Sequence, residues 1–219
     1  MVRHHPAEDL LIDYATGALG EAEGLVVATH LALCPDCRAT VAAYEAMGGA
    51  MLDGIAPEPV GGDLLDRVMA RLDETPPAPI RRAAARPAAA GRAPMIPRPL
   101  RDYVGGDLGD VAWKPVMRGL DEHRIACTGG AKVRLMRIRA GVSMPQHTHK
   151  GREMTLVLAG GFTDDTGHFL RGDLSLTDGT VDHVPTADDD GDCVCLAVTD
   201  APLRLTGPIG RLFNPFIRF

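Results

Sequence analysis

The order of apolar and polar residues divides the chain into a helical first part and a strand-rich second part. Up to residue 74, apolar residues recur at spacings of three and four, which places them on one face of a helix. From about residue 100, short apolar runs are separated by glycine and aspartate clusters, a pattern typical of short strands in a closed or sandwich β architecture. The predicted fold class is therefore α + β, in more than one domain.

Four helices are expected in the first part, over about residues 6–17, 21–33, 35–50 and 63–74. The last has the clearest amphipathic pattern, with one side formed by Leu64, Leu65, Val68, Met69 and Leu72. Fewer than about 80 residues rarely form a sufficient core without a disulfide or a bound metal. We therefore expect a metal to hold this small four-helix domain together, and any apolar face left uncovered to be a docking surface.

Strands are expected in the runs KVRLMRIRAG, EMTLVLAGG and CVCLAVTD of the second part. Between the two parts, residues 75–99 contain seven prolines, five arginines and no acidic residue. Because proline interrupts both helices and sheets, this segment is predicted to be an extended linker between domains at residues 1–74 and 100–219. A flexible linker transmits strain poorly, which favours communication between the domains by dissociation or proteolysis over a rigid lever.

Charge and composition exclude several classes of protein. The formal net charge is -6 and no basic patch is interleaved with aromatic residues, so direct binding to nucleic acid is not expected. No apolar run has the length of a signal peptide core or of a membrane span, so a cytoplasmic location without membrane contact is expected. The five cysteines are an odd number in a chain without an export signal, which favours metal or redox chemistry over disulfides.

Four residues around the first three predicted helices form a candidate metal site. His30, Cys34 and Cys37 have the spacing H-x3-C-x2-C, which lets an imidazole and two sulfurs reach one ion. His5, just before the first helix, is the candidate fourth ligand, although spacing alone leaves His4 open. Two thiolates with two imidazoles favour a closed, structural zinc site. The alternative is a redox C-x2-C pair, but the βαβ pattern that usually accompanies one is absent.

A second candidate site contains only nitrogen and oxygen donors. His147 and His149 alternate along a predicted strand and so share a face, Glu153 begins the next strand, and His183 comes from a later one. The four converge only if those strands are neighbours. Such a set suits zinc, iron, manganese, nickel or copper and usually leaves coordination positions open.

The remaining candidates carry weaker signals. Cys193 and Cys195 alternate on an apolar strand and are either a redox-sensitive pair or two buried apolar side chains. The second interpretation is favoured because no nearby positive group that would lower a thiol pKa is evident. His123 and His168 are expected at the surface or along the barrel wall, and Cys127 in the core. No acid or base suited to catalysis is visible beyond the metal ligands.

Two stretches resemble known domains. Residues 1–74 resemble the zinc-binding anti-sigma domain, in which a histidine before the first helix and an H-x3-C-x2-C motif hold one zinc and four helices clamp an extracytoplasmic-function sigma factor. The segment from Gly141 to Gly160 matches cupin motif 1, G-x5-H-x-H-x3-E-x6-G, at every fixed position. The second cupin motif keeps Gly172 and His183, but its proline, second glycine and asparagine are replaced by Asp178, Thr180 and Ala187.

The order of these domains is similar to that of the ChrR family of anti-sigma factors. The resemblance implies a jelly-roll-like cupin barrel after the zinc domain, and a complex with one extracytoplasmic-function sigma factor per chain. It also implies release of that partner on an oxidative signal, singlet oxygen or organic hydroperoxide, sensed through the cupin domain. The expected protein is a regulator and not an enzyme. The alternative is a metal-dependent cupin dioxygenase with an accessory zinc-binding helical domain.

Overall fold

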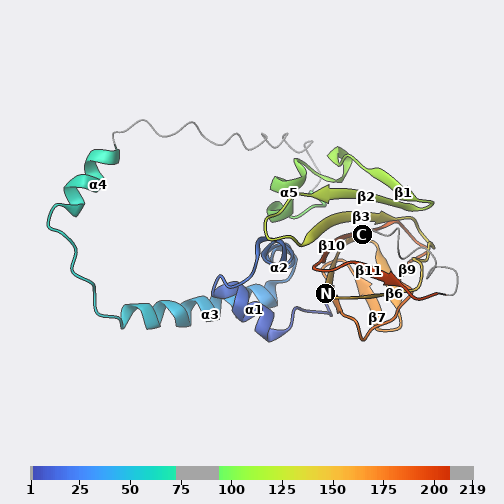
Figure 1. Cartoon of the computed structure of the whole chain (residues 1–219), viewed down its shortest axis with the longest axis horizontal. Coiled ribbons are helices and arrows are strands. Elements are labelled where there is room, and N and C mark those ends of the chain that lie inside the picture. The colour runs from blue at the N-terminus through green and yellow to red at the C-terminus, as the bar shows by residue number, and fades with distance from the viewer. Residues whose placement is uncertain (1, 73–93, 208–219) are drawn as a thin grey trace.

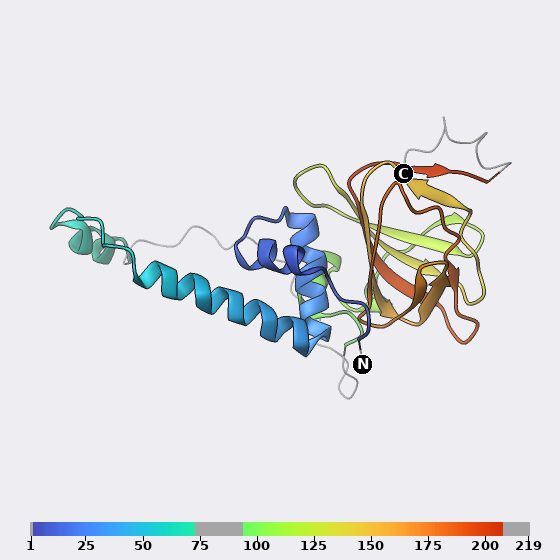
Figure 2. The same ribbon diagram turned by 90° about the horizontal axis from the view of Figure 1, so that it is seen from below.

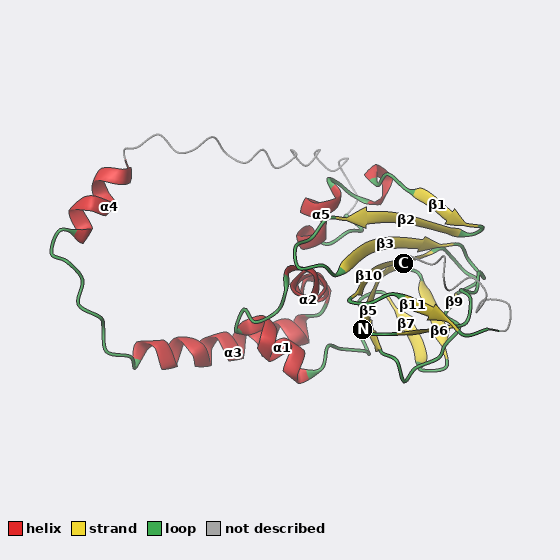
Figure 3. Cartoon of the chain, in the orientation of Figure 1, coloured by secondary structure: helices red, strands yellow, loops and turns green. Residues whose placement is uncertain are grey.

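The computed structural model describes residues 2–72 and 94–207, so most of the predicted linker lies outside the described residues. Helices gather at one end of the molecule and strands at the other (Figure 3). This division confirms the α + β class that the apolar pattern predicts.

The four predicted helices are present as α1 (Glu8–Ala15), α2 (Glu21–Leu33), α3 (Pro35–Asp53) and α4 (Leu64–Leu72). Helix α2 lies between α1 and α3 on one side and the strands on the other (Figure 1). Its residues are therefore buried on more than the one face that the sequence indicates; Val26, Val27 and His30 are fully buried.

The four helices do not form one compact bundle. Helix α3 extends past its predicted end at Ala50 and leaves the body of the molecule (Figures 1 and 2). Helix α4 contains no buried residue, although its apolar pattern is the strongest of the four. The apolar side of α4 is therefore available to a partner.

The second part begins with α5 (Arg98–Val104) and a 3-10 turn, η1 (Leu108–Asp110), and continues as a barrel of short strands. The strands are β1 (Lys114–Met117), β2 (Leu120–Ile125), β3 (Lys132–Ile138), β4 (His147–His149), β5 (Glu153–Ala159), β6 (Gly161–Asp164), β7 (Gly167–Leu170), β8 (Leu174–Thr177), β9 (Thr186–Ala187), β10 (Cys193–Thr199) and β11 (Leu203–Leu205). The largest sheet has the order β1-β2-β3-β10-β5-β8, a second has the order β7-β6-β9, and β11 pairs with β4.

Strand β10 shows how the large sheet is covered on both faces. It pairs antiparallel with β3 and β5, and all seven of its residues are buried. Side chains alternate along a strand, so Cys195 faces the barrel interior while Leu196 faces the helices. A strand covered on both sides is uniformly apolar, which explains the continuous run CVCLAV.

The helical part and the barrel share one hydrophobic core. Helix α2 packs against α5, β5 and β10, and one cluster of buried residues runs from Val26 to Leu196. Ile96, inside the predicted linker, is fully buried, and α5 begins at Arg98. The two parts are therefore related by direct packing as well as by the linker. Within the described ranges no single helix could cross a membrane by length and apolarity; α2 and α3 pass that test only as a pair bent by 118°.

Candidate metal centres

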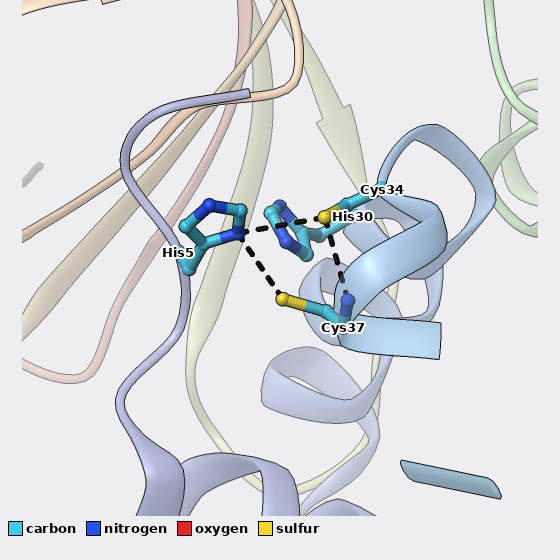
Figure 4. Close-up of side chains that lie close together, drawn as sticks. All are labelled: His5, His30, Cys34 and Cys37. Atoms are coloured by element: carbon cyan, nitrogen blue, oxygen red, sulfur yellow. Dashed lines mark hydrogen bonds between the residues drawn. The ribbon is translucent and has the colours of Figure 1, made fainter. Parts of the chain in front are cut away.

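The structure brings the four Cys/His candidates of the helical part together. His5 Nδ1 lies 3.2 Å from Cys37 Sγ and 3.4 Å from Cys34 Sγ (Figure 4). One donor atom from each of these residues and from His30 lies within 4.8 Å of the others. The neighbouring His4 instead packs its ring against Phe169, with the centroids 4.4 Å apart. Of the two histidines that spacing left open, His5 is therefore the one in the cluster.

The junction between α2 and α3 positions the two sulfurs. Cys34 ends α2 and is the N-cap of α3, Pro35 occupies the first turn, and the Cys37 amide donates to Cys34 Sγ at 3.5 Å. The positive end of α3 favours negative charge at these sulfurs. Burial, together with the Cys34 thiol, raises the pKa of Cys37 to about 12. A cation that holds both thiolates must therefore displace a proton that the metal-free site retains at neutral pH.

His30 supplies the clearest sign that this cluster suits a metal. Its Nδ1 lies 2.8 Å from the carbonyl oxygen of Gly172. A carbonyl only accepts, so Nδ1 carries the proton and Nε2 presents a lone pair. That Nε2 is buried without a hydrogen-bond partner. Burial also lowers the pKa of His30, which keeps the ring neutral and able to bind a cation. Two sulfurs and two imidazoles at this spacing fit zinc.

The second set also converges, at the barrel interior. His149 Nε2 lies 3.2 Å from a Glu153 oxygen and 3.5 Å from His183 Nε2, which in turn lies 3.2 Å from His147 Nε2. The strands are neighbours as the prediction required, because His147 and His183 exchange both backbone hydrogen bonds. All four donor atoms lie within 4.8 Å of one another.

Hydrogen bonds on the outer side of the rings fix their tautomers. His147 Nδ1 donates to the carbonyl oxygen of Pro145 at 2.8 Å, and His183 Nδ1 bonds to the Asp164 carboxylate at 2.7 Å. The Nε2 lone pairs of these two rings therefore face each other, an arrangement that is repulsive until a cation lies between them. Nothing in the sequence marks Asp164 as a partner of His183, because it lies nineteen positions away on β6.

Burial sets the charge of this second site. It lowers the pKa values of His147 and His149 to about 4. It also raises the pKa of Glu153 to about 7, an effect that Arg134 partly offsets. Near neutral pH the rings of His147 and His149 offer lone pairs, and the Glu153 carboxyl group ionises readily once a cation is bound. The donor set fits a divalent transition metal.

The departures from the second cupin motif have a local explanation. Asp178 Oδ1 accepts from the backbone amide of Thr180 at 2.8 Å and from its hydroxyl at 2.6 Å. This aspartate turn takes the place of the proline and glycine that the motif usually has. His183 follows shortly after and still reaches the cluster, so the turn is rebuilt and the ligand position is kept.

The weaker candidates stay outside both clusters. His123 Nδ1 contacts the carbonyl oxygen of Ala112, and His168 Nε2 contacts the Asp188 carboxylate. Cys127 was expected in the core; it is half-buried and packs against the core.

Cys193 and Cys195 are both buried. Their mutual hydrogen bond, reinforced by burial, raises the pKa of Cys195 well above its usual range. A thiol held in the protonated form is a weak nucleophile. Their burial agrees with the favoured interpretation as two buried apolar side chains, and a redox role stays the alternative.

Comparisons with known proteins agree with this geometry. A family model described as the ChrR cupin-like domain matches residues 102–202, and a zinc-finger family model matches residues 5–38. The chain is 44% identical over 218 residues to the anti-sigma-E factor ChrR of Cereibacter sphaeroides, covering 99% of both chains. The crystal structure of Rhodobacter sphaeroides SigE in complex with the anti-sigma ChrR matches with a TM-score of 0.78 and 42% identity. That match covers 91% of this chain and 100% of the other.

A zinc-type Cys/His cluster that joins the segment before α1 to the junction of α2 and α3, together with a cupin barrel that has its own donor set, defines a two-module anti-sigma factor. The chain belongs to the ChrR family of anti-sigma factors. It is accordingly a regulator of transcription and not an enzyme.

Proposed function

We propose that this chain binds an extracytoplasmic-function sigma factor, one per chain, through α3 and α4, and releases it on oxidative stress sensed through the cupin barrel. The relative whose structure is known was crystallised in complex with SigE, and the present chain aligns with that relative over its full length. The unpartnered apolar surface on these two helices is the observation that carries the proposal.

That surface consists of large apolar side chains that water would otherwise cover. On the distal half of α3, Met51 and Leu52 are 74% and 68% exposed. On α4, Leu65 and Leu72 are 69% and 70% exposed. A helix with a strong apolar stripe and no burial is stabilised mainly when a partner covers that stripe. Methionines among these side chains adapt to the shape of a partner helix.

Zinc has a structural role in this proposal. The Cys/His cluster joins the segment before α1 to the junction of α2 and α3. It therefore fixes the direction in which α3 leaves the body. In so small a helical unit the free energy of metal binding is also free energy of folding. We infer that the binding surface forms only while the cluster holds its ion.

The cupin barrel is connected to this cluster by direct contacts rather than by the linker. The turn between β7 and β8 presents the Gly172 carbonyl to the His30 ring. The adjacent Asp173 side chain is almost fully buried and accepts from the amides of Arg3 and His4 at 2.6 and 3.0 Å. These residues directly precede His5. A change within the barrel thus has a short path to two of the four candidate zinc ligands.

The test is capture of the sigma factor from the native host by the purified full chain. We expect Met69→Asp to weaken capture by tenfold or more, because it places a charge in the apolar stripe of α4. Ala70→Asp is the matched control: it adds the same side chain to the opposite face of the same helix and should leave capture unchanged. Equal capture by wild type and Met69→Asp would exclude α4 from the binding surface.

A further inference from the structure

The barrel contains a cavity of about 200 Å³ that opens directly onto the second metal cluster. His147, Glu153 and His183 line one part of it, while the ring of His149 is not exposed to the cavity. An ion held by the four ligands would therefore have its open side toward the cavity. The remaining wall is mostly apolar, with contributions from Met136, Ile138, Met144 and Phe162.

A buried ion pair is the main polar feature of this wall. Arg134 and Glu122 are 8% and 6% exposed, and Arg134 Nε lies 3.7 Å from a Glu122 oxygen. Their charges cancel, and Glu122 also accepts from Arg124 Nε at 2.7 Å. A divalent ion together with the Glu153 carboxylate would leave about one positive charge in this apolar enclosure. Such a space favours a ligand with a single negative charge and an apolar body.

We propose that the cavity binds a small apolar monocarboxylate, with its carboxylate at the open side of the metal and its hydrocarbon part against the methionine-rich wall. An engineered cavity of about 150 Å³ in another protein holds a benzene molecule. The present cavity therefore suits a body of roughly six to ten non-hydrogen atoms. The ligand site is separate from the binding surface on α3 and α4, so this inference does not depend on the proposed function.

The test is a titration of the full chain, loaded with Co²⁺ at the barrel site, with acetate, butyrate, hexanoate and benzoate. The visible spectrum of Co²⁺ reports a change in its ligands, and calorimetry reports affinity. We expect affinity to rise about three- to fourfold for each methylene that enters the cavity, so hexanoate should bind at least tenfold more tightly than acetate. Hexanol and hexylammonium should bind far more weakly than hexanoate, because neither supplies an anionic donor. Removal of the metal should also abolish the preference for hexanoate over hexanol and hexylammonium.

Two variants separate filling of the cavity from general damage. Val116 on β1 lines the cavity, so Val116→Trp should occupy the space and lower hexanoate affinity at least tenfold while acetate still reaches the metal. Lys114→Trp on the same strand is the control, because Lys114 is exposed and does not line the cavity. Circular dichroism and metal content should match in both variants. The proposal is overturned if acetate and hexanoate bind equally, or if hexanoate binds the metal-free chain and the Val116→Trp variant as well as it binds the loaded wild type.

Discussion

At the scale of single residues, the two metal clusters differ in how each donor is prepared for a cation. In the barrel, Pro145 and Asp164 hold the outer nitrogens of two histidines and so turn the other nitrogens inward. In the helical part, the Gly172 carbonyl does the same for His30. Burial then keeps the imidazoles of His30, His147 and His149 neutral. Both clusters are thus arrays of lone pairs that a cation stabilises.

The pKa values predict how metal affinity at the barrel depends on pH. Burial raises the pKa of Glu153 to about 7, whereas those of His147 and His149 are lowered to about 4. Between pH 5 and 7 the metal must therefore displace one proton, from Glu153, and none from the two rings. Affinity should rise by up to about tenfold per pH unit below 7 and level off above it.

This dependence is measurable by competition titration between pH 5.5 and 8.5, on protein whose Cys/His cluster already holds zinc. Glu153→Gln carries no ionisable proton at this position, so its weaker binding should lose most of the pH dependence. A wild-type affinity that stays constant from pH 5.5 to 7 would contradict the assignment of the proton to Glu153.

At the scale of elements, the turn between β7 and β8 joins the two metal modules. Asp173 accepts amides of residues 3 and 4 and, at 2.9 Å, that of Leu170. Burial alone would raise the pKa of Asp173, but these hydrogen bonds lower it below its ordinary value. The carboxylate therefore stays ionised. Gly172 has a φ of +94°, and a Cβ there would lie 2.7 Å from Val2. The turn is therefore fitted to the segment that carries His5.

Replacing Asp173 should weaken zinc binding at a site to which it contributes no ligand. Asp173→Asn removes the negative charge and leaves one acceptor oxygen for three amides, those of Arg3, His4 and Leu170, which weakens the hold on the segment before His5. Zinc affinity should fall by roughly tenfold or more, as for other outer residues that orient metal ligands. A chelator competition assay measures this directly. Asp178→Asn is the control, since Asp178 is exposed and its bonds go to Thr180. Identical zinc affinities in the two variants would show that the turn does not support the cluster.

Much of the two sites could be predicted from sequence because ligand spacing is local. The spacing H-x3-C-x2-C and the alternation of His147 with His149 each lie within one or two elements. Helix and strand periodicity was therefore enough to predict that these side chains share a site. The contacts of Asp173 and of the His30 ring could not be predicted, since their partners lie about 170 and 142 positions away. The exposure of α4 could not be predicted either, because a sequence pattern indicates an apolar face but not what covers that face.

At the scale of the whole molecule, α2 packs the helical part and the barrel against each other. It is packed between the other helices and the large sheet, and its acidic N-terminal end adds contacts to the barrel. Glu21 accepts from the Thr128 amide at 2.6 Å, and Arg152 bonds to Glu23 at 2.9 Å. A rearrangement of the barrel would therefore reach the base of α3 through a packed interface. This favours transmission by contact over dissociation across the linker.

Sensing through the barrel is tested most directly by measuring release of a fluorescently labelled sigma factor from its complex with the full chain. An organic hydroperoxide or photochemically generated singlet oxygen supplies the signal. Wild type should bind the sigma factor before treatment and release it afterwards. The double variant His147→Ala/Glu153→Ala, which lacks half of the barrel donors, should bind equally well and retain its partner after treatment. If the double variant releases the sigma factor as wild type does, the barrel site is not the sensor. The assignment of a structural role to the Cys/His cluster and of sensing to the barrel site would then be wrong.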